Sequence, residues 1–210
     1  MAAAALSSLR AATGRLALFA VGRPAYDGGR ACTLGLNTTN TAGLAFSIRD
    51  SRSADFDRLW EIDQRCFPSG ISYTQMELGG FITKRNAITL VGEFQSGEAG
   101  HDADLASAEE NPVDRIAGFV VAHPIRCKYG RILTLDILPE ARRYGLGIKL
   151  MTACEERLRS LGCADVYLET AVNNEPAVQL YGKLGYQILR TLPDYYASHS
   201  LDAFQMRKRL

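Results

Sequence analysis

The hydrophobic pattern of residues 45–210 switches between the two periods that distinguish helices from strands. Apolar positions recurring every three to four residues predict amphipathic helices at residues 55–67, 75–83, 145–161 and 175–184. Short apolar or alternating runs predict strands at residues 45–49, 87–94, 116–123, 131–137, 166–170, 185–189 and 203–208. The strands first follow one another and then alternate with helices. We therefore expect an α/β fold with a mixed sheet between two helical layers.

Two segments do not follow this pattern. Residues 1–43 are rich in small residues and arginine and contain a single acid, Asp27, a composition that resembles an organelle transit peptide. A signal peptide fits less well because the apolar run at residues 16–21 is short, and a disordered bacterial extension or an upstream start codon is the other interpretation. Residues 95–115 are polar and acidic, which predicts a mobile insertion. Residues 44–210 are expected to form a single domain.

The composition narrows the functional classes. The 210 residues are 47% hydrophobic and 22% charged, as in ordinary globular proteins. A net charge of +1 provides no long-range attraction for nucleic acid or an anionic membrane, so neither is expected as a partner. The five cysteines are scattered and show no metal-ligand spacing, so we expect no metal and buried free thiols in a reducing compartment. The cytoplasm is the expected location, with an organelle as the alternative if residues 1–43 form a transit peptide.

A basic turn between the strand at 131–137 and the helix at 145–161 is the strongest chemical signal. Its glycines, Gly145 and Gly147, allow close approach of a ligand to the backbone, and the N-terminus of the helix attracts anions. The turn therefore predicts a phosphate site, although a plain strand-to-helix turn also fits. A P-loop is excluded because no Ser or Thr follows Lys149, and a dinucleotide fingerprint is excluded because Leu150 replaces its third glycine.

The motif Arg142-x-x-Gly145-x-Gly147 resembles the pyrophosphate-binding signature of the GCN5-related N-acetyltransferase (GNAT) superfamily. Residues 166–169, 173–177 and 180–186 resemble the second half of that fold. The similarity extends over residues 44–210 and is closest to the ribosomal-protein-alanine and N-terminal acetyltransferase branch. It implies a mainly antiparallel sheet, and acetyl-CoA as the acetyl donor without a metal.

The resemblance also implies the roles of individual residues. Glu169 is expected to be the base and Tyr181 a hydrogen-bond donor to the cofactor sulfur. Tyr195 and Tyr196 are expected in a loop that covers the peptide substrate. The expected cofactor contacts are Leu135, Asp136, Ile137, Arg142, Arg143, Tyr144, Gly145, Leu146, Gly147, Ile148 and Asn174.

Several of these roles carry a physical qualification. A free Glu and an α-amine differ by about 3.7 pKa units, so direct abstraction by Glu169 costs about 5 kcal/mol and a water relay is favoured. The resemblance also implies that the strand bulges and splays from its neighbour at residues 135–137, where unpaired backbone N–H groups would stabilise the oxyanion. Asp136 departs from the small or apolar residue common there; it is either solvent-facing or attracts an ammonium substrate. Asn174 has a second role as a helix N-cap.

The function expected is direct acetyl transfer from acetyl-CoA to the α-amine of a protein or peptide N-terminus, with a ribosomal protein among the candidates. The enzyme is expected to be a monomer or a weak homodimer. One alternative is acetylation of a small amine, an amino acid or a lysine side chain. Another is a non-catalytic acyl-CoA-binding sensor, against which the presence of both Glu169 and Tyr181 argues.

Overall fold

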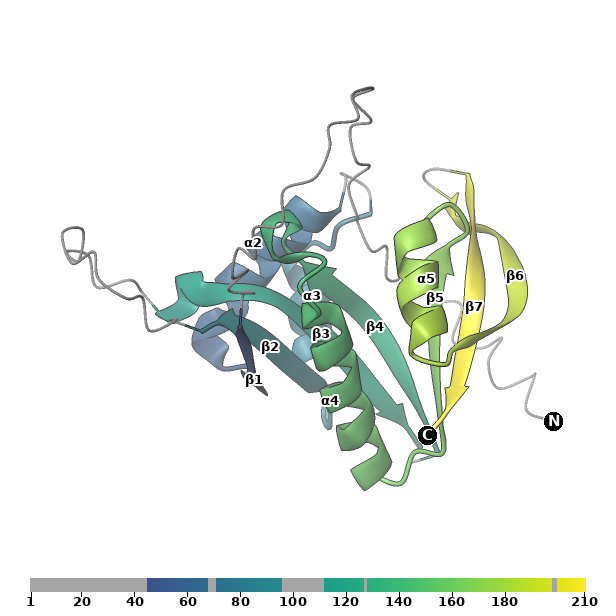
Figure 1. The fold of residues 1–210 in the computed structure, drawn as a ribbon, viewed down its shortest axis with the longest axis horizontal. Helices are drawn as coiled ribbons and strands as arrows, with labels where there is room; N and C mark the ends of the chain where they lie inside the picture. Colours follow the sequence, from purple (N-terminus) through teal and green to yellow (C-terminus); the bar gives the residue numbers. More distant parts are fainter. Residues whose placement is uncertain (1–44, 68–70, 96–111, 127, 198–199) are drawn as a thin grey trace, which may run out of the picture.

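The computed structural model describes residues 45–67, 71–95, 112–126, 128–197 and 200–210 (Figure 1). The predicted N-terminal extension at residues 1–43 lies outside this part of the chain, as does most of the predicted insertion at residues 95–115.

The described residues form a seven-stranded sheet in the order β1-β2-β3-β4-β5-β7-β6. The strands are β1 (Phe46–Asp50), β2 (Ile88–Phe94), β3 (Ile116–Ile125), β4 (Tyr129–Ile137), β5 (Asp165–Ala171), β6 (Gln187–Tyr196) and β7 (Leu201–Arg209). All neighbouring strands are antiparallel except the central pair, β4 and β5, which are parallel. This arrangement confirms the predicted mixed and mainly antiparallel sheet.

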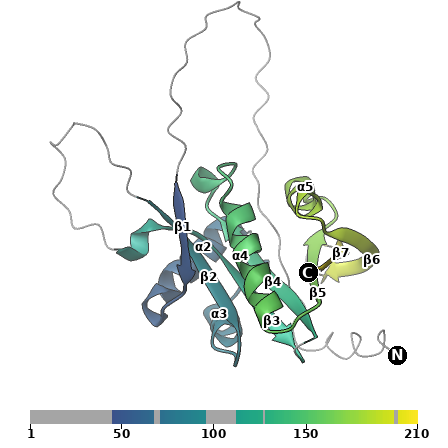
Figure 2. The same ribbon diagram turned by 60° about the horizontal axis from the view of Figure 1, so that its bottom comes forward.

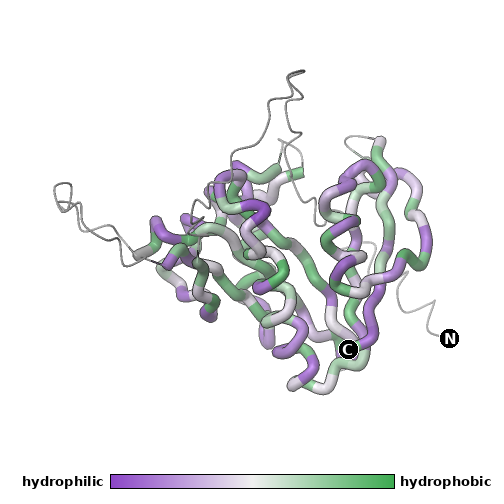
Figure 3. The backbone as a smooth tube through the Cα atoms, viewed as in Figure 1, coloured by the Kyte–Doolittle hydropathy of each residue, from purple (hydrophilic) through white to green (hydrophobic). Residues whose placement is uncertain are grey.

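Helices cover both faces of the sheet, which confirms the predicted three layers (Figures 1 and 2). On one face, α4 (Leu146–Ser160) crosses β2, β3 and β4, and α5 (Glu175–Lys183) lies over β5 and β7. On the other face lie α2 (Phe56–Cys66) and α3 (Gln75–Ile82). Figure 3 shows the apolar positions concentrated along the central strands, where both faces are buried.

Local capping explains where two of these helices begin and end. Thr74 Oγ1 accepts the N–H of Glu77 at 3.2 Å, and the Glu77 carboxylate accepts the N–H of Thr74 at 3.0 Å. This is a capping box, which satisfies backbone donors that the helix leaves unpaired. Gly162 follows α4 with φ +85°, a left-handed conformation that glycine adopts without strain. The predicted end of that helix is thus confirmed.

The central strands β4 and β5 pair only over their first residues. Tyr129, Gly130 and Arg131 of β4 lie opposite Asp165, Val166 and Tyr167 of β5, and beyond this point the two strands diverge (Figure 1). We call this separation of β4 from β5 the splay. It was expected from the family resemblance, and it opens the middle of the sheet between α4 and α5.

The bulge in β4 lies earlier than predicted. The β3–β4 register shifts between Val121, which faces Thr134, and Ala122, which faces Ile132, so Leu133 is the extra residue. Residues 134–137 pair regularly with β3, and the prediction of a bulge at residues 135–137 is therefore wrong. The extra residue increases the local twist, which helps β4 turn away from β5 directly after their last paired residues.

The predicted loop containing Tyr195 and Tyr196 is also corrected. Both tyrosines belong to the end of strand β6, where pairing with β7 is irregular between Leu192 and Tyr196. Pro193 lacks an N–H and Asp194 has φ +49°, features that an edge strand accommodates at a bulge. This irregularity removes the period-two alternation from the sequence, so the pattern did not show a strand there.

Gly118 of β3 lies so close to the backbone of β4 that a side chain has no room there. It lies opposite Ile137, and a Cβ at this position would be 2.4 Å from the Asp136 carbonyl oxygen and 3.2 Å from the Ile137 Cα. Both neighbours belong to the backbone of β4, at the splay. The glycine therefore allows the backbone of β3 to lie close to the backbone of β4 where β4 diverges from β5.

We predict that Gly118→Ala lowers the free energy of unfolding by about 1–3 kcal/mol, because the added methyl displaces backbone rather than a flexible side chain. Gly80→Ala is the matched control: it lies exposed in α3 with no atom within 4 Å of the new Cβ, and alanine favours the helix. Urea denaturation of both variants measures the difference. Equal stability of the two variants would contradict the tight contact.

Candidate functional site

The start of α4 presents unpaired backbone donors next to the splay. The first bond within the helix runs from the Lys149 N–H to the Gly145 carbonyl at 3.1 Å. The N–H groups of Leu146, Gly147 and Ile148 therefore have no partner within the helix. Gly145 has φ +84°, and Arg143 is also left-handed with φ +69°. The turn thus exposes several N–H groups at the positive end of the helix dipole, as an anion site requires.

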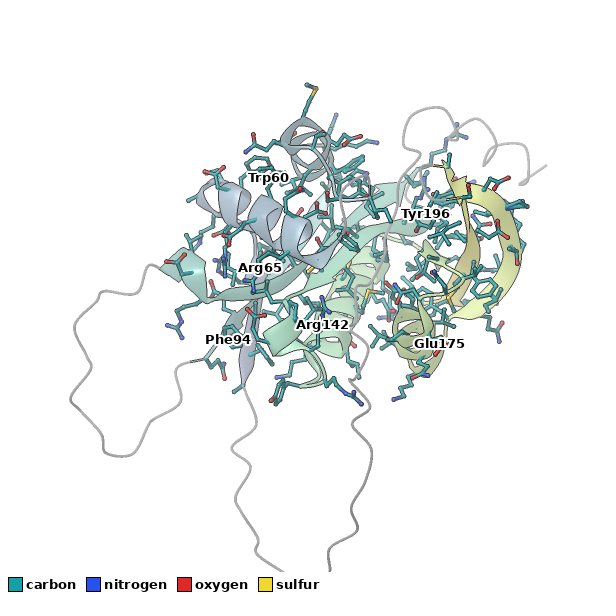
Figure 4. The ribbon with its side chains drawn as sticks, turned by 90° about the horizontal axis from the view of Figure 1, so that it is seen from above. Trp60, Arg65, Phe94, Arg142, Glu175 and Tyr196 are labelled. Atoms are coloured by element: carbon teal, nitrogen blue, oxygen red, sulfur yellow. The ribbon has the colours of Figure 1, made fainter. Side chains whose placement is uncertain are left out.

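The two predicted arginines of this turn point in different directions. Arg142 Nε donates to the Ile137 carbonyl at 2.9 Å, and its Nη2 lies 3.9 Å from Cys66 Sγ of α2. Its guanidinium therefore braces the turn against the end of β4. Arg143 is exposed, as are Tyr144 and Ile148, so these side chains are accessible to a ligand. Figure 4 places Arg142 and Glu175, which begins α5, on opposite sides of the splay.

Two predicted residues from the α5 side carry polar atoms without a partner among the described residues. Asn174 caps α5, with its Oδ1 accepting the Ala177 N–H at 3.4 Å, while its Nδ2 is buried and unpaired. Tyr181 is fully buried, and its hydroxyl is also unpaired. Burying such donors without a partner costs free energy. A bound ligand in the splay would satisfy both.

The opposite edge of the splay provides backbone donors. The Leu138 N–H bonds the Ala117 carbonyl of β3 at 2.9 Å. Successive residues of a strand direct their N–H groups to opposite sides, so residues two apart direct them to the same side. The N–H of Asp136, two residues before Leu138, therefore also faces β3. The N–H groups of Leu135 and Ile137 face the splay, beyond the end of the β4–β5 pairing. Leu135 and Ile137 are thus placed to bond a ligand through their N–H groups, and Asp136 is not.

These donors fit an extended cofactor with a pyrophosphate and an amide-containing arm. Exposed N–H groups and Arg143 lie at the helix start, where a pyrophosphate would bind. The donors of Leu135 and Ile137 would bind amide carbonyls of the arm. The hydroxyl of Tyr181 would meet its thioester sulfur. Coenzyme A has these groups in this order, so the described residues fit acetyl-CoA.

Glu169 lies on the other side of the splay, in a polar network. It is buried, and its Oε2 accepts Arg131 Nε at 3.3 Å and Nη2 at 3.2 Å. Its Oε1 accepts Gln205 Nε2 at 2.9 Å. The predicted base is therefore a buried carboxylate paired with a cation rather than an isolated carboxyl group. Arg131 is the last β4 residue paired with β5, so this ion pair lies where the splay begins.

The two predicted substrate tyrosines differ in their contacts. The hydroxyl of Tyr195 accepts Arg131 Nη2 at 3.3 Å, which links it to the Glu169 network. Burial raises the pKa of Tyr195, and the Glu169 charge raises it further. Tyr196 is buried and packs against Tyr195, with ring centroids 5.1 Å apart. Tyr195 is thus part of the candidate site, and Tyr196 packs against Tyr195.

A second buried polar group lies under the end of β4. Asp136 is 1% exposed, so the interpretation of a solvent-facing residue is wrong. Its carboxyl group interacts electrostatically with that of Asp63 of α2, which is also buried. Burial raises the pKa of both carboxyl groups. The sequence pointed to Asp136 but not to its partner.

Sequence reasoning missed four residues of these networks: Asp63, Tyr73, Arg131 and Gln205. A signal was present for two of them. Asp63 interrupts the apolar stripe of a helix between Ile62 and Cys66, and Arg131 is charged at the start of an otherwise apolar strand. Gln205 and Tyr73 gave no comparable signal, because their roles depend on partners distant in the chain.

Metal-ligand groups, cysteines and long apolar helices complete the description of the side chains. Within the described ranges, no group of three His, Cys, Asp or Glu side chains could hold a metal ion. The cysteines Cys66, Cys154 and Cys163 are buried, as expected for structural thiols. In the same part of the chain, no helix is long and apolar enough to cross a membrane.

Comparison with known proteins agrees with this geometry. An N-alpha-acetyltransferase of Sulfolobus acidocaldarius is 31% identical over 175 residues, covering 78% of this chain and 92% of the relative. The structure of Ard1 from Thermoplasma volcanium has a TM-score of 0.64 at 24% identity, over 80% of this chain and 99% of that one. A ribosomal-protein-alanine N-acetyltransferase from Escherichia coli has a TM-score of 0.62 at 17% identity, over 79% and 94%. Both structures share the fold.

The family model for the acetyltransferase (GNAT) family matches residues 56–186. This range runs from α2 to the end of α5 and includes the splay, the basic turn, Glu169 and Tyr181. The predicted family, fold class and enzyme class are thereby confirmed. The chain belongs to the acetyltransferase (GNAT) family.

Proposed function

We propose that this enzyme transfers an acetyl group from acetyl-CoA to the α-amine of a protein or peptide N-terminus. One observation carries the proposal: polar groups with complementary roles lie on the two faces of the splay. Tyr181 reaches it from α5, on the face that also carries α4. Gly130 faces Leu158 of α4, so the next residue, Arg131, directs its side chain to the opposite face together with Glu169.

The donor side binds acetyl-CoA. Its pyrophosphate lies at the start of α4, where the helix dipole and the exposed Arg143 offset its charge. Leu135 and Ile137 hold the arm, and the acetyl carbonyl oxygen lies near one of their N–H groups. As the amine attacks, negative charge develops on this oxygen, and a fixed N–H donor stabilises it. The hydroxyl of Tyr181 donates to the departing sulfur.

The acceptor side is formed by Arg131, Glu169, Tyr195 and Gln205. A water molecule links the Glu169 carboxylate to the amine by hydrogen bonds. This link orients the amine so that the lone pair of its nitrogen points at the thioester carbon. Arg131 balances the buried charge of Glu169, and Tyr195 fixes the position of Arg131. The names of several relatives support an N-terminal acceptor, including the N-alpha-acetyltransferase of Sulfolobus acidocaldarius. The Escherichia coli structure extends the candidate acceptors to a ribosomal protein with N-terminal alanine.

The acceptor is tested with a library of peptides that differ in their first two residues, each with a free or formylated N-terminus, beside free lysine and spermidine. We expect acetylation of free N-termini and no product with formylated ones, because the attacking nitrogen needs its lone pair. Mass spectrometry locates the acetyl group. Transfer only to spermidine or to lysine would contradict the proposed acceptor.

The phosphate site is tested by Arg143→Glu, which reverses a charge beside the N-terminus of α4. We expect acetyl-CoA to bind about tenfold more weakly, equivalent to about 1.4 kcal/mol. Arg159→Glu makes the same change on the exposed last turn of the same helix and should leave binding unchanged. Isothermal titration calorimetry measures both affinities. Equal effects of the two substitutions would argue against a phosphate at the turn.

The role of Tyr181 is tested by Tyr181→Phe, which removes a hydroxyl that has no protein partner among the described residues. Because no internal hydrogen bond is lost, folding stability should change little, while kcat falls by about 10–100-fold. Tyr186→Phe is the matched control: its ring packs edge-on against that of Tyr181 with the centroids 5.8 Å apart, and its hydroxyl likewise has no hydrogen-bond partner among the described residues. Steady-state release of coenzyme A gives kcat. A Tyr181→Phe enzyme with wild-type kcat would refute this role.

A further inference from the structure

Strand β6, at the edge of the sheet, contains one extra residue (Figure 1). Ile188 lies opposite Met206 of β7, whereas Gln205, the residue before Met206, lies opposite Arg190. Leu189 is therefore the extra residue and forms a bulge. It is 49% exposed, so burial in the core does not account for the bulge.

The bulge decides which side chain of β6 faces Gln205. In regular pairing Leu189 would lie opposite Gln205, and Arg190 would share a face of the sheet with Ile188. The extra residue moves the Arg190 side chain to the other face. Bulges next to active sites commonly redirect a side chain in this way.

Arg190, Gln205 and Glu169 form a row of hydrogen-bonded side chains across three neighbouring strands. Arg190 Nε donates to Gln205 Oε1 at 3.0 Å, and Gln205 Nε2 donates to Glu169 Oε1 at 2.9 Å. Gln205 lies directly opposite both of its partners, which places the three side chains on one face. Arg190 is exposed and Gln205 is buried. The row thus links the edge of the sheet to the carboxylate of the acceptor side.

The chemistry of the side chains gives this row a single direction. A guanidinium donates hydrogen bonds and accepts none, so the Gln205 atom that contacts Arg190 is the carbonyl oxygen. The NH2 group of Gln205 then faces Glu169. If the amide turned over, its oxygen would face the carboxylate, and two buried acceptors would meet without a donor. Arg190 therefore holds the Gln205 amide in the orientation that Glu169 needs.

These contacts leave Glu169 with one free position for a hydrogen bond. An ionised carboxylate offers about four such positions. Two N–H groups of Arg131 occupy Oε2, and the NH2 group of Gln205 occupies one position on Oε1. The remaining position, on Oε1, is available to the water that orients the amine. Its direction depends on the Gln205 bond to the same oxygen.

A second irregularity of β6 brings another side chain to the same network. Pairing with β7 is irregular again towards the end of β6, where the Tyr195 hydroxyl accepts Arg131 Nη2 at 3.3 Å. The two irregular segments of β6 therefore supply the two side chains that contact the partners of Glu169. Arg190 contacts Gln205, and Tyr195 contacts Arg131.

We propose that Arg190 is a positioning residue for the acetyl transfer: it holds the Gln205 amide and thereby fixes the Glu169 oxygen that binds the water beside the attacking amine. Arg190 contacts neither the amine nor acetyl-CoA and acts through Gln205. This inference rests on the acetyl transfer proposed above, and it holds for any amine acceptor.

The test is Arg190→Ala, which removes the donor that holds Gln205. We expect kcat to fall by about tenfold, because a misdirected water orients the amine poorly, with unchanged acetyl-CoA affinity. Arg190→Lys keeps a donor at this position and should restore most of kcat. Arg207→Ala is the matched control and should keep wild-type kcat. Arg207 follows Gln205 by two residues in β7, and its guanidinium pairs with Asp165 rather than with the Glu169 network.

A double-mutant cycle separates positioning from a general structural role. Arg190→Ala is also made in a Glu169→Gln enzyme, which has already lost the carboxylate. If Arg190 acts through Glu169, its removal causes no further loss of kcat in that background, so the two effects are not additive. Equal losses in both backgrounds would overturn the proposal. Wild-type kcat in Arg190→Ala, or a matching loss in Arg207→Ala, would overturn it as well.

Steady-state release of coenzyme A gives kcat, and isothermal titration calorimetry gives the acetyl-CoA affinity. The acceptor is whichever of an alanine-initiated peptide or spermidine the wild-type enzyme acetylates. Transfer to spermidine alone would contradict the N-terminal acceptor and leave this comparison intact. A Glu169→Gln enzyme with wild-type kcat would overturn the roles of both Glu169 and Arg190.

Discussion

The separation of β4 from β5 is the constraint on which the rest of this structure depends. Parallel pairing joins the two halves of the sheet only up to Arg131; beyond it β4 is held by β3 alone and β5 by β7 alone. As a result, several backbone N–H groups at the splay have no hydrogen-bond partner in the sheet. Such donors are tolerated in a buried region when a ligand completes the hydrogen bonding. The binding site is therefore a break in the sheet rather than a structure added to it.

The same break brings together groups that would otherwise be kept apart. Tyr181 and Glu169 come from opposite faces and lie on either side of the splay, where no strand separates the two faces. The two carboxyl clusters near the splay are balanced differently. Glu169 is paired with a cation, Arg131, whereas Asp136 lies near another acid, Asp63, and burial and the charge of Asp63 raise the pKa of Asp136.

The predictable parts of the fold were those whose signals are local. The capping box at Thr74 and Glu77, the glycine after α4 and the N-cap at Asn174 involve residues a few positions apart, and each is present. The bulge and the end of β6 were misplaced because both depend on register with a neighbouring strand. A shift of register between two strands does not change the hydrophobic pattern of either strand taken alone. The expected roles of Glu169 and Tyr181 in catalysis stay predictions that the proposed variants can test.

By itself, the sequence determined the family, the order of helices and strands, and the basic turn with its unpaired N–H groups at the start of α4. These features follow from periodicity, glycine geometry and a motif contained within a short stretch of chain. Only the tertiary structure decided that Arg142 braces β4 while Arg143 faces outward, that Arg131 balances Glu169, and that Asp136 is buried near another acid, Asp63. The physical reason is that the charge state and accessibility of a side chain depend on its spatial neighbours, which folding brings from distant segments.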